Sequence, residues 1–312
     1  MILTITMNPA LDKIYVIDDF KVDEIFRIDN MEINAAGKGV NVARVINKLG
    51  SPVKASGILG GNTGDYINNQ LERTDIINEF VKIKENTRTC VKVIDNRNNT
   101  TTELLESGPE VSEKEIDEFL SKYENLIEKC EIITGCGSLA PGLPDKFYQN
   151  LIDLARSRNK KFLLDTSGKA FAEGIEKKPY MIKPNREEVE NLLSRKYSRI
   201  RDFVDPLKYF RDKGITFPVI TLGGKGCVVL IDTEIYYFKG LSLKTKNVVG
   251  SGDAFIAGCA LALEQEKTPI EIIKMGMACG HANTQFYKTG MVSKALVNEY
   301  YDKINFKKIA RI

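Results

Sequence analysis

The sequence predicts an α/β fold: a three-layer sandwich with a mostly parallel central sheet and a small second β-sheet beside it. Short apolar runs alternate with segments of helical periodicity, a rhythm typical of a sheet covered by helices on both faces. The runs IITG, FLLD and PVITL are almost continuously apolar, as expected of central parallel strands. Two further segments alternate apolar and polar residues and predict the small sheet.

Eight apolar runs are expected as strands of the central sheet, because each is short and rich in β-branched or aromatic residues. In chain order they are Ile2–Thr6, Val53–Ile58, Glu131–Thr134, Phe162–Asp165, Tyr180–Ile182, Pro218–Leu222, Cys227–Ile231 and Ile235–Phe238.

Helices are expected between these strands, where apolar residues recur at helical spacing. Val40–Leu49 is followed by Gly50, a helix-stop residue, and Ser112 with Glu115 forms a capping box that opens the next amphipathic helix. By the same logic we expect helices at Asp145–Ser157, Arg186–Ser194 and Asp253–Gln265.

Residues 11–34 and 87–105 interrupt this rhythm. Both segments read as half-exposed antiparallel strands, and the second folds back at the turn-rich DNRNN. A sheet with one apolar face has to cover something, which is a ligand cleft, a partner or both. An ordinary extension of the sheet edge explains the pattern equally well.

Composition narrows the function classes. The chain has 312 residues, 43% hydrophobic and 28% charged, as in soluble globular proteins. The 45 basic and 42 acidic residues leave a net charge of +3, so we expect no nucleic-acid partner, although a local basic pocket remains compatible with it. No run approaches the ~18 apolar residues of a membrane helix, and the first residues do not resemble a secretory signal. We therefore expect a cytoplasmic protein with no membrane partner.

Histidine and cysteine content excludes further classes. His281 is the single histidine, so no multi-histidine metal site exists and a serine or cysteine nucleophile would have only this partner. The six cysteines contain no C-x-x-C pair, which argues against zinc-ribbon and thioredoxin-like sites. Several lie in apolar runs, which favours buried, reduced thiols.

The first candidate motif is AAGKGVN, which ends at Asn41. Gly37 and Gly39 flank Lys38 just before a predicted helix, where backbone amides and the helix N-terminus favour an anion. Lys38 and Asn41 could hold phosphate or sugar oxygens. A glycine turn into a helix is the alternative, and no Walker loop occurs in the sequence.

The second motif is VGSGDAF, residues 249–255. Gly250, Ser251 and Gly252 would present unpaired amides at a helix start, which suits negative charge. Asp253 could cap the helix, but we favour a role as the base that accepts a proton from an attacking hydroxyl while the amides hold a phosphoryl group.

Two more motifs follow predicted strands. In KPNREE, Asn185 and Glu188 share one helix face and could organise Mg²⁺ waters while Lys183 meets phosphate oxygens; a capping box is the alternative. TLGGKG, from Thr221 to Gly226, is a glycine-rich strand exit at the edge where open α/β sheets bind ligands, and it could also be a hairpin turn.

The order of these four motifs resembles the ribokinase-like PfkB family of sugar kinases over essentially the whole chain. TMNPALD at residues 6–12, TRT at 87–89, LESGP at 105–109 and GSL at 137–139 resemble the branch that holds 1-phosphofructokinase and tagatose-6-phosphate kinase. The resemblance implies a ribokinase-like sandwich whose body is residues 1–10, 36–86 and 108–312. Residues 11–35 and 87–107 would form a β lid over the sugar, through which many members form a homodimer.

The resemblance also implies the reaction and its residues. ATP with Mg²⁺ would phosphorylate a sugar hydroxymethyl group, with Asp253 as base and Gly250, Ser251 and Gly252 as anion hole. Glu188, with Asn185, would be tied to Mg²⁺ through water. The nucleotide side would include Lys183, Asn185, Thr221, Gly223, Gly226 and Asn283, and the sugar side Asp12, Gly37, Lys38, Asn41, Arg88 and Ser138.

Three hypotheses follow. The leading one is a phosphohexose kinase that converts fructose 1-phosphate to fructose 1,6-bisphosphate, since Lys38 and Arg88 suit a phosphorylated substrate. Tagatose-6-phosphate kinase is the close alternative. A non-catalytic sugar-phosphate sensor on the same fold is the third, and Asp253 argues against it. Ala36 replaces the usual glycine before Gly37, which could shift the sugar-side geometry. No family motif supports catalysis by His281, which we interpret as structural.

Overall fold

The structure is a computed structural model that describes residues 1–98 and 100–312. Its larger sheet has eleven strands within these residues, in the order β15-β14-β13-β12-β11-β10-β9-β1-β4-β5, with β6 paired to β4. The strands are β1 (Ile2–Thr6), β4 (Val53–Gly60), β5 (Ile77–Asn78), β6 (Val81–Ile83), β9 (Ile132–Cys136), β10 (Lys161–Asp165), β11 (Met181–Ile182), β12 (Phe217–Thr221), β13 (Gly226–Ile231), β14 (Glu234–Lys239) and β15 (Phe306–Arg311).

The predicted parallel centre of this sheet is confirmed. The strands from β5 and β6 across to β12 pair in parallel, and β12, β13, β14 and β15 continue the sheet as antiparallel strands. TLGGKG joins β12 to β13, so it is a hairpin turn as well as a strand exit. All residues of β1 and β9 are buried, because helices cover both faces of the sheet here.

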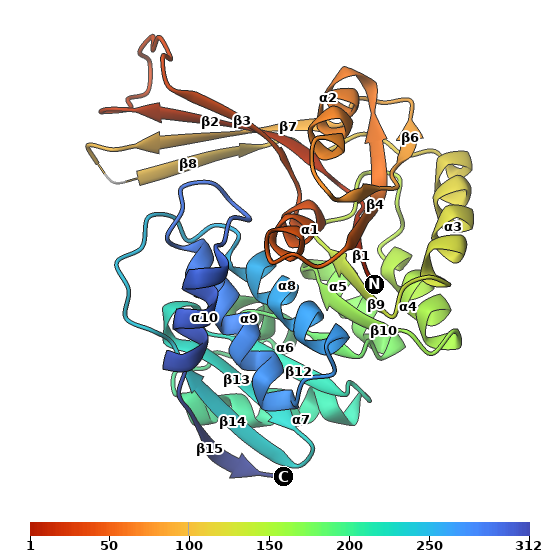
Figure 1. Cartoon of the computed structure of the whole chain (residues 1–312), viewed down its shortest axis with the longest axis vertical. Coiled ribbons are helices and arrows are strands. Elements are labelled where there is room, and N and C mark those ends of the chain that lie inside the picture. Colours follow the sequence, from red (N-terminus) through yellow and green to blue (C-terminus); the bar gives the residue numbers. More distant parts are fainter. Residues whose placement is uncertain (99) are drawn as a thin grey trace.

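Helices form the two outer layers (Figure 1). One apolar core lies between the sheet and α1, α2, α8, α9 and α10, and a second lies between the sheet and α3 to α7. The helices are α1 (Lys38–Lys48), α2 (Gly61–Glu72), α3 (Glu113–Ile127), α4 (Phe147–Ser157), α5 (Gly168–Gly174), α6 (Arg186–Leu193), α7 (Val204–Asp212), α8 (Ser251–Glu264), α9 (Pro269–Asn283) and α10 (Lys294–Lys303), with 3₁₀ turns at Ile175–Lys177, Ile200–Phe203 and Gly223–Lys225.

Several elements differ from the sequence prediction. The first helix begins at Lys38 and not at residue 40, because Gly37 adopts a positive φ of 117° and serves as its N-cap. Helices α2, α5, α7 and α10 and strands β5, β6 and β15 were not predicted. Strand β15 carries the exposed, charged run FKKIAR on the edge of the sheet, which hides its β character.

A separate four-stranded sheet projects from the body, at the upper left of Figure 1. Its order is β3-β2-β7-β8, with β2 at Ala10–Ile17, β3 at Met31–Ala36, β7 at Arg88–Asp95 and β8 at Thr100–Leu105. The predicted second sheet is therefore confirmed, but the expectation of antiparallel strands throughout is wrong. Its central pair, β2 and β7, is parallel, because the chain passes through the body between them and enters the sheet twice from the same end.

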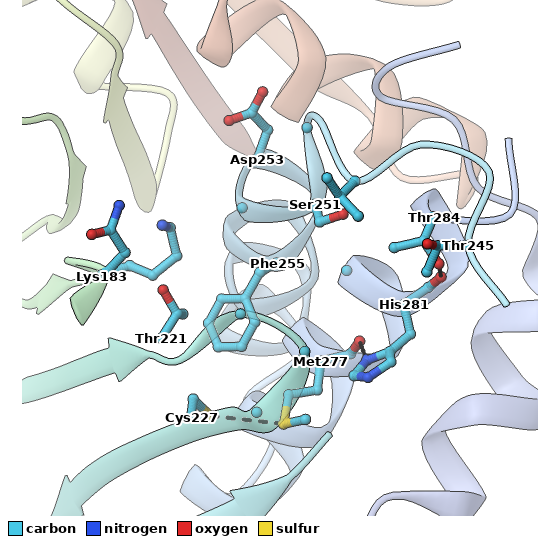
Figure 2. A pocket seen from close by; sticks show the side chains of 18 of the residues that line it. Lys183, Thr221, Cys227, Thr245, Ser251, Asp253, Phe255, Met277, His281 and Thr284 are labelled. Carbon is cyan, nitrogen blue, oxygen red and sulfur yellow. Dashed lines mark hydrogen bonds between the residues drawn. The ribbon is translucent and has the colours of Figure 1, made fainter. Parts of the chain in front are cut away.

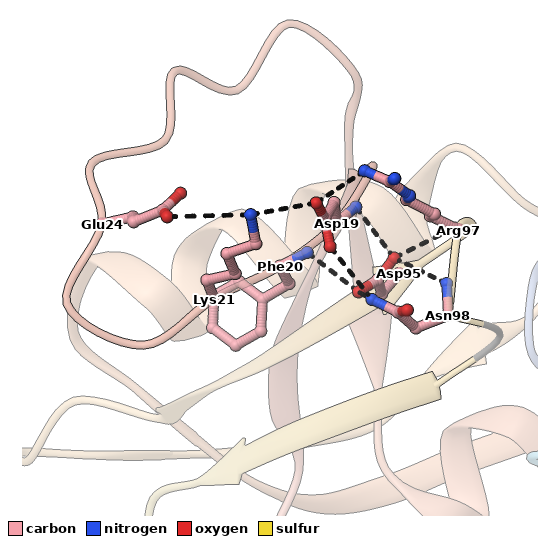
Figure 3. A network of polar contacts seen from close by, with 7 residues as sticks. All are labelled: Asp19, Phe20, Lys21, Glu24, Asp95, Arg97 and Asn98. Atoms are coloured by element: carbon pink, nitrogen blue, oxygen red, sulfur yellow. Dashed lines mark hydrogen bonds and ion pairs between the residues drawn. The ribbon is translucent and has the colours of Figure 1, made fainter.

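The segment between β2 and β3 is irregular, and Asp95 anchors its start (Figure 3). The Asp95 carboxylate accepts hydrogen bonds from the backbone amides of Asp19 and Phe20, at 3.0 and 2.8 Å, and from Asn98. These donors outweigh the effect of burial and lower the pKa of Asp95 to about 2. One buried carboxylate thus joins the β2–β3 segment to the turn after β7.

The cysteines fit the expectation of buried, reduced thiols. All six cysteines are free and buried. Within residues 1–98 and 100–312, no helix combines the length and apolar character needed to cross a membrane.

Candidate active site

A cavity of about 560 Å³ opens where β10, β11 and β12 end and α8 begins (Figure 2). Open α/β sheets bind ligands at this carboxyl edge, because the strands deliver side chains there and helix N-termini face the opening. Predicted site residues that line the cavity are Lys38, Lys183, Asn185, Glu188, Thr221, Gly223, Gly226, Gly250, Ser251, Gly252 and Asp253.

The glycine turn before α8 forms one end of the cavity. Gly250 has a φ of 79°, and a Cβ on it would lie 2.3 Å from Thr289 Cγ2, so only glycine fits. The Ser251 amide donates to the Val248 carbonyl at 3.3 Å. The following amides, of Gly252 and Asp253, belong to the first turn of α8 and lack intrahelical acceptors. The anion hole expected at Gly250, Ser251 and Gly252 stays a prediction. In this turn the amides of Gly252 and Asp253 are the ones suited to an anion.

Asp253 is the buried carboxylate of this turn. It is 6% exposed, and its Oδ2 accepts a 2.8 Å hydrogen bond from Asn41 Nδ2. Burial, reinforced by the nearby Asp165, raises the pKa of Asp253 to about 6, while Lys38 and the Asn41 bond oppose the rise. A carboxylate with a pKa near neutrality is suited to accept and release a proton.

Two lysines meet at Asp165, the last residue of β10. Lys183 Nζ lies 3.3 Å and Lys38 Nζ 3.4 Å from the same oxygen, Oδ1 of Asp165. The two ammonium groups outweigh burial and keep the pKa of Asp165 below its ordinary value, and Asp165 in turn raises the pKa of Lys38. Oδ2 of Asp165 is buried and has no hydrogen-bond partner among the described residues. The cluster therefore brings two fixed positive charges and one unsatisfied carboxylate oxygen to the cavity.

Asn185 and Glu188 form the capping box of α6. Asn185 Oδ1 accepts from the Glu188 amide at 2.9 Å, and Glu188 Oε2 accepts from the Asn185 amide at 2.8 Å. Both side chains also line the cavity. The cap therefore explains their spacing and fixes them beside the Lys183 ammonium at the end of β11.

The other end of the cavity is glycine-rich and more apolar. Thr221 ends β12, and a Cβ on Gly223 would meet nothing within 4 Å, so the turn leaves open space. Gly226 has a φ of 108°, and a Cβ there would lie 2.0 Å from the Phe238 carbonyl oxygen. The remaining wall is made by the segment after β14 and by α9, through Leu241, Ser242, Leu243, Thr245, Val248, Met277, Gly280, His281 and Thr284.

The sugar-side candidates lie around the junction of the small sheet and the body. Asp12 is on β2, where burial raises its pKa against the attraction of Lys92 and Arg88. The guanidinium of Arg88 donates to the carbonyls of Glu106 and Asn8, each at 3.0 Å, and its buried Nε has no partner among the described residues. Ser138 accepts a 3.3 Å hydrogen bond from Asn8. Arg88 and Ser138 thus both contact Asn8.

Two predicted contact residues have mainly internal partners. Asn283 is fully buried and donates from Nδ2 to the Val249 carbonyl at 2.9 Å, while Gly290 donates to its Oδ1. Its place on the nucleotide side stays a prediction: its side chain bonds to the turn before α8, and Asn283 is not among the residues that line the cavity. Asn41 uses Nδ2 for Asp253 and Oδ1 for Arg44, so it orients the carboxylate.

Gly37 has a steric role at the start of α1. A Cβ on it would lie 2.7 Å from Thr6 Cγ2. The close approach of this turn to β1 places Lys38 as the first helical residue, with its side chain directed to Asp165.

Sequence reasoning missed Asp165. Its signal was present, since a carboxylate directly after the apolar run FLL falls at the carboxyl edge of a central strand. Arg44 and Lys92 were missed as well, because a basic residue on a predicted helix or alternating strand reads as solvent-facing. Both side chains have partners within the protein. Arg44 donates hydrogen bonds to three acceptors, and Lys92 forms an ion pair with Glu103 at 2.9 Å.

Comparison with known proteins agrees with this geometry. Residues 5–294 match a protein-family model described as "pfkB family carbohydrate kinase". The structure is similar to that of a Thermotoga maritima protein described as a possible 1-phosphofructokinase, with a TM-score of 0.91, 25% identity and 99% of each chain covered. It also shares its fold with phosphofructokinase-2 from Escherichia coli in complex with substrates and products, with a TM-score of 0.89, 23% identity, and 97% of this chain and 98% of that chain covered. The chain belongs to the pfkB family of carbohydrate kinases.

Proposed function

We propose that this sugar kinase uses ATP to phosphorylate a phosphohexose, with fructose 1-phosphate as substrate and fructose 1,6-bisphosphate as product. Tagatose 6-phosphate, giving the 1,6-bisphosphate of tagatose, is the alternative substrate. Both are phosphorylated ketohexoses that offer a primary hydroxyl, and the same cations would serve either. The likeness to the Thermotoga maritima protein favours fructose 1-phosphate.

The observation that carries the proposal is the position of Asp253. This carboxylate is buried in the first turn of α8, at the edge of the cavity and next to the amides of Gly252 and Asp253. We propose that it takes the proton from the attacking hydroxyl while the amides receive the negative charge of the transferred group. Phosphoryl transfer requires mainly positioning and charge neutralisation, which this turn combines.

The residues of the cavity fit a nucleotide with its metal. Lys38 and Lys183 offer positive charge beside the turn, and the glycine-rich end near Gly223 is open enough for a base. The unsatisfied Oδ2 of Asp165 and the carboxylate of Glu188 are hard oxygen donors on the same cavity. Bound Mg²⁺ would neutralise phosphate charge, and we propose that Glu188, with Asn185, holds it through water.

We further propose that residues 11–35 and 87–107 act as a lid over the sugar and that residues 1–10, 36–86 and 108–312 form the catalytic body. Asp12 and Arg88 on the lid would then face the sugar phosphate, with Gly37, Lys38, Asn41 and Ser138 below them. A homodimer through the lid is supported by the exposed strand β8, on which Leu104 is 61% and Leu105 64% exposed. Six buried free thiols support a cytoplasmic location.

A release assay for ADP tests the proposal. Purified protein is given ATP and Mg²⁺ with fructose 1-phosphate, tagatose 6-phosphate, fructose 6-phosphate or fructose. We expect the highest kcat/KM with fructose 1-phosphate and the lowest with unphosphorylated fructose. If fructose 1-phosphate is bound in calorimetry but no sugar gives turnover above that of Asp253→Asn, the protein is a sugar-phosphate sensor and the kinase proposal is wrong.

A further inference from the structure

His281 connects helix α9 to the irregular segment that follows β14. The Leu241 amide donates a 2.9 Å hydrogen bond to His281 Nε2, and His281 Nδ1 lies 2.7 Å from the Met277 carbonyl oxygen. Both His281 and Met277 are seen on the wall of the cavity in Figure 2.

These two contacts define the protonation state of the ring. A backbone amide can only donate, so Nε2 has to accept; a carbonyl can only accept, so Nδ1 has to carry the proton. A neutral imidazole has one donor and one acceptor and satisfies both partners only as the Nδ1–H tautomer. A second proton would place an N–H group on Nε2, facing the N–H group of Leu241, and the bond would be lost.

The segment held by this bond makes much of the apolar end of the cavity. Residues 241–245 have no regular secondary structure, and Leu241, Ser242, Leu243 and Thr245 line the cavity. On either side of them, Gly240 donates to the Lys225 carbonyl at 3.0 Å and Lys246 to the Thr284 carbonyl at 2.8 Å. The bond to His281 therefore fastens the wall just where the irregular stretch begins.

Resting on the proposed function, we propose that His281 is a positioning residue for ATP: the neutral ring holds the wall at Leu241–Thr245 in place, and protonation of the ring releases it and weakens nucleotide binding. His281 would then do more than the purely structural role expected from the sequence. It would not contact the phosphates or the sugar, so its effect is on nucleotide affinity and not on the chemical step.

The surroundings of the ring favour its neutral form. Burial lowers the pKa of His281, and the bond to the Met277 carbonyl opposes that change. Neither cause is a charged side chain. The elements around the ring carry charged residues of both signs. They are Glu271 and Lys274 on α9, Glu234 and Lys239 on β14, Lys244 and Lys246 on the following segment, Asp253 and Glu264 on α8, and Lys294, Glu299, Asp302 and Lys303 on α10.

The single histidine allows a direct test by nuclear magnetic resonance. Long-range ¹H–¹⁵N spectra of the full-length protein report the tautomer and the pKa of His281 without assignment, because no other histidine contributes. We expect the Nδ1–H tautomer and a pKa below the ordinary value of 6.5. An Nε2–H tautomer would overturn the proposal, and this result does not depend on any nucleotide.

Affinity for ATP with Mg²⁺ is then measured by calorimetry from about pH 8 to about pH 5.5, for the wild type and for His281→Gln and His281→Ala. Glutamine offers an oxygen that accepts from Leu241 and does not titrate. We expect His281→Gln to bind ATP like the wild type at pH 8, and we expect His281→Ala to bind ATP roughly 3- to 10-fold more weakly. Phosphates and Asp253 also titrate near about pH 6. The readout is therefore the ATP affinity of the wild type divided by that of His281→Gln at each pH.

This ratio of ATP affinities should fall by the same roughly 3- to 10-fold as His281 gains its proton, because only the wild type loses the bond to Leu241. A ratio that stays constant over the pH range, or wild-type affinity in His281→Ala, would overturn the inference while leaving the kinase intact. Absence of ATP binding by the wild type at pH 8 would instead overturn the proposed function, and the inference with it.

Discussion

Asn41 Nδ2 donates a 2.8 Å hydrogen bond to Oδ2 of Asp253, and this bond joins α1 to the turn that begins α8. Asn41 is itself held, because its Oδ1 accepts a 3.0 Å hydrogen bond from Arg44. Two motifs at opposite ends of the sequence thus become one unit in which an amide orients a buried carboxylate.

Asp253→Asn should reduce kcat roughly 10²- to 10⁴-fold and leave binding of the sugar phosphate nearly intact, because only the proton acceptor is lost.

The Asp253→Asn variant should also be more stable than the wild type at pH 8. Since the pKa of Asp253 rises from 3.8 to about 6 on folding, the folded state binds the proton more tightly, and stability falls as the pH rises through this window. Calorimetry of sugar binding, steady-state kinetics and thermal melts check all three; near-normal turnover would refute the assignment.

Turnover of the wild type should fall as the pH drops through about 6, because protonated Asp253 cannot accept a proton. The bond from Asn41 lowers the pKa of this group, so Asn41→Leu should move the acid limb of the kcat profile to higher pH. Profiles of kcat against pH for both proteins test this. An acid limb that does not move would show that Asn41 does not tune the carboxylate.

Asp165→Asn should lower kcat roughly 10²-fold and shift the alkaline limb of activity to lower pH. The reason is that Asp165 raises the pKa of Lys38, so without it the ammonium loses its proton more readily. Asp145→Asn is the matched control, since this aspartate is 57% exposed and pairs only at 3.9 Å with Lys169. Equal kcat values and pH profiles for the two variants would show that Asp165 has no role in turnover.

Arg88→Ala should raise the KM for the phosphorylated sugar about 10- to 100-fold and leave the KM for ATP nearly unchanged, as loss of a charged hydrogen-bond donor predicts. Exposed Arg73 at the end of α2 provides the control variant Arg73→Ala, which should behave like the wild type. Preference between fructose and its 1-phosphate is the decisive quantity. If the preference is the same in Arg88→Ala and the wild type, this arginine does not recognise the phosphate.

Asp95→Asn should destabilise the small sheet and speed hydrogen exchange at the amides of Asp19 and Phe20, which bond to this carboxylate. Folding lowers the pKa of Asp95 from 3.8 to about 2. The stabilisation of the folded state by this carboxylate is therefore fully present above the pKa of the unfolded state, 3.8, and is lost as the pH falls through about 2. The difference in Tm from the wild type should therefore shrink on acidification below about pH 4. Asp65→Asn, at an exposed pair with Lys82, is the control and should show no such pH dependence.

The layered fold and the positions of the motifs follow from local sequence patterns. Short, almost continuously apolar runs such as FLLD favour central strands covered on both faces, and glycine turns such as the one at Gly250 have few conformations that a chain can adopt. Capping chemistry between Asn185 and Glu188 is local, so spacing alone predicts it.

Which of these residues contact one another depends on the long-range packing of the chain. Asp165 becomes a site residue because parallel strands bring Lys38 and Lys183 to it from distant positions, and no local pattern records that meeting. The parallel pairing of β2 and β7 and the inward turn of Asn283 have the same cause. Long-range pairing depends on how the body closes between the segments, whereas periodicity reports only which face of an element is apolar.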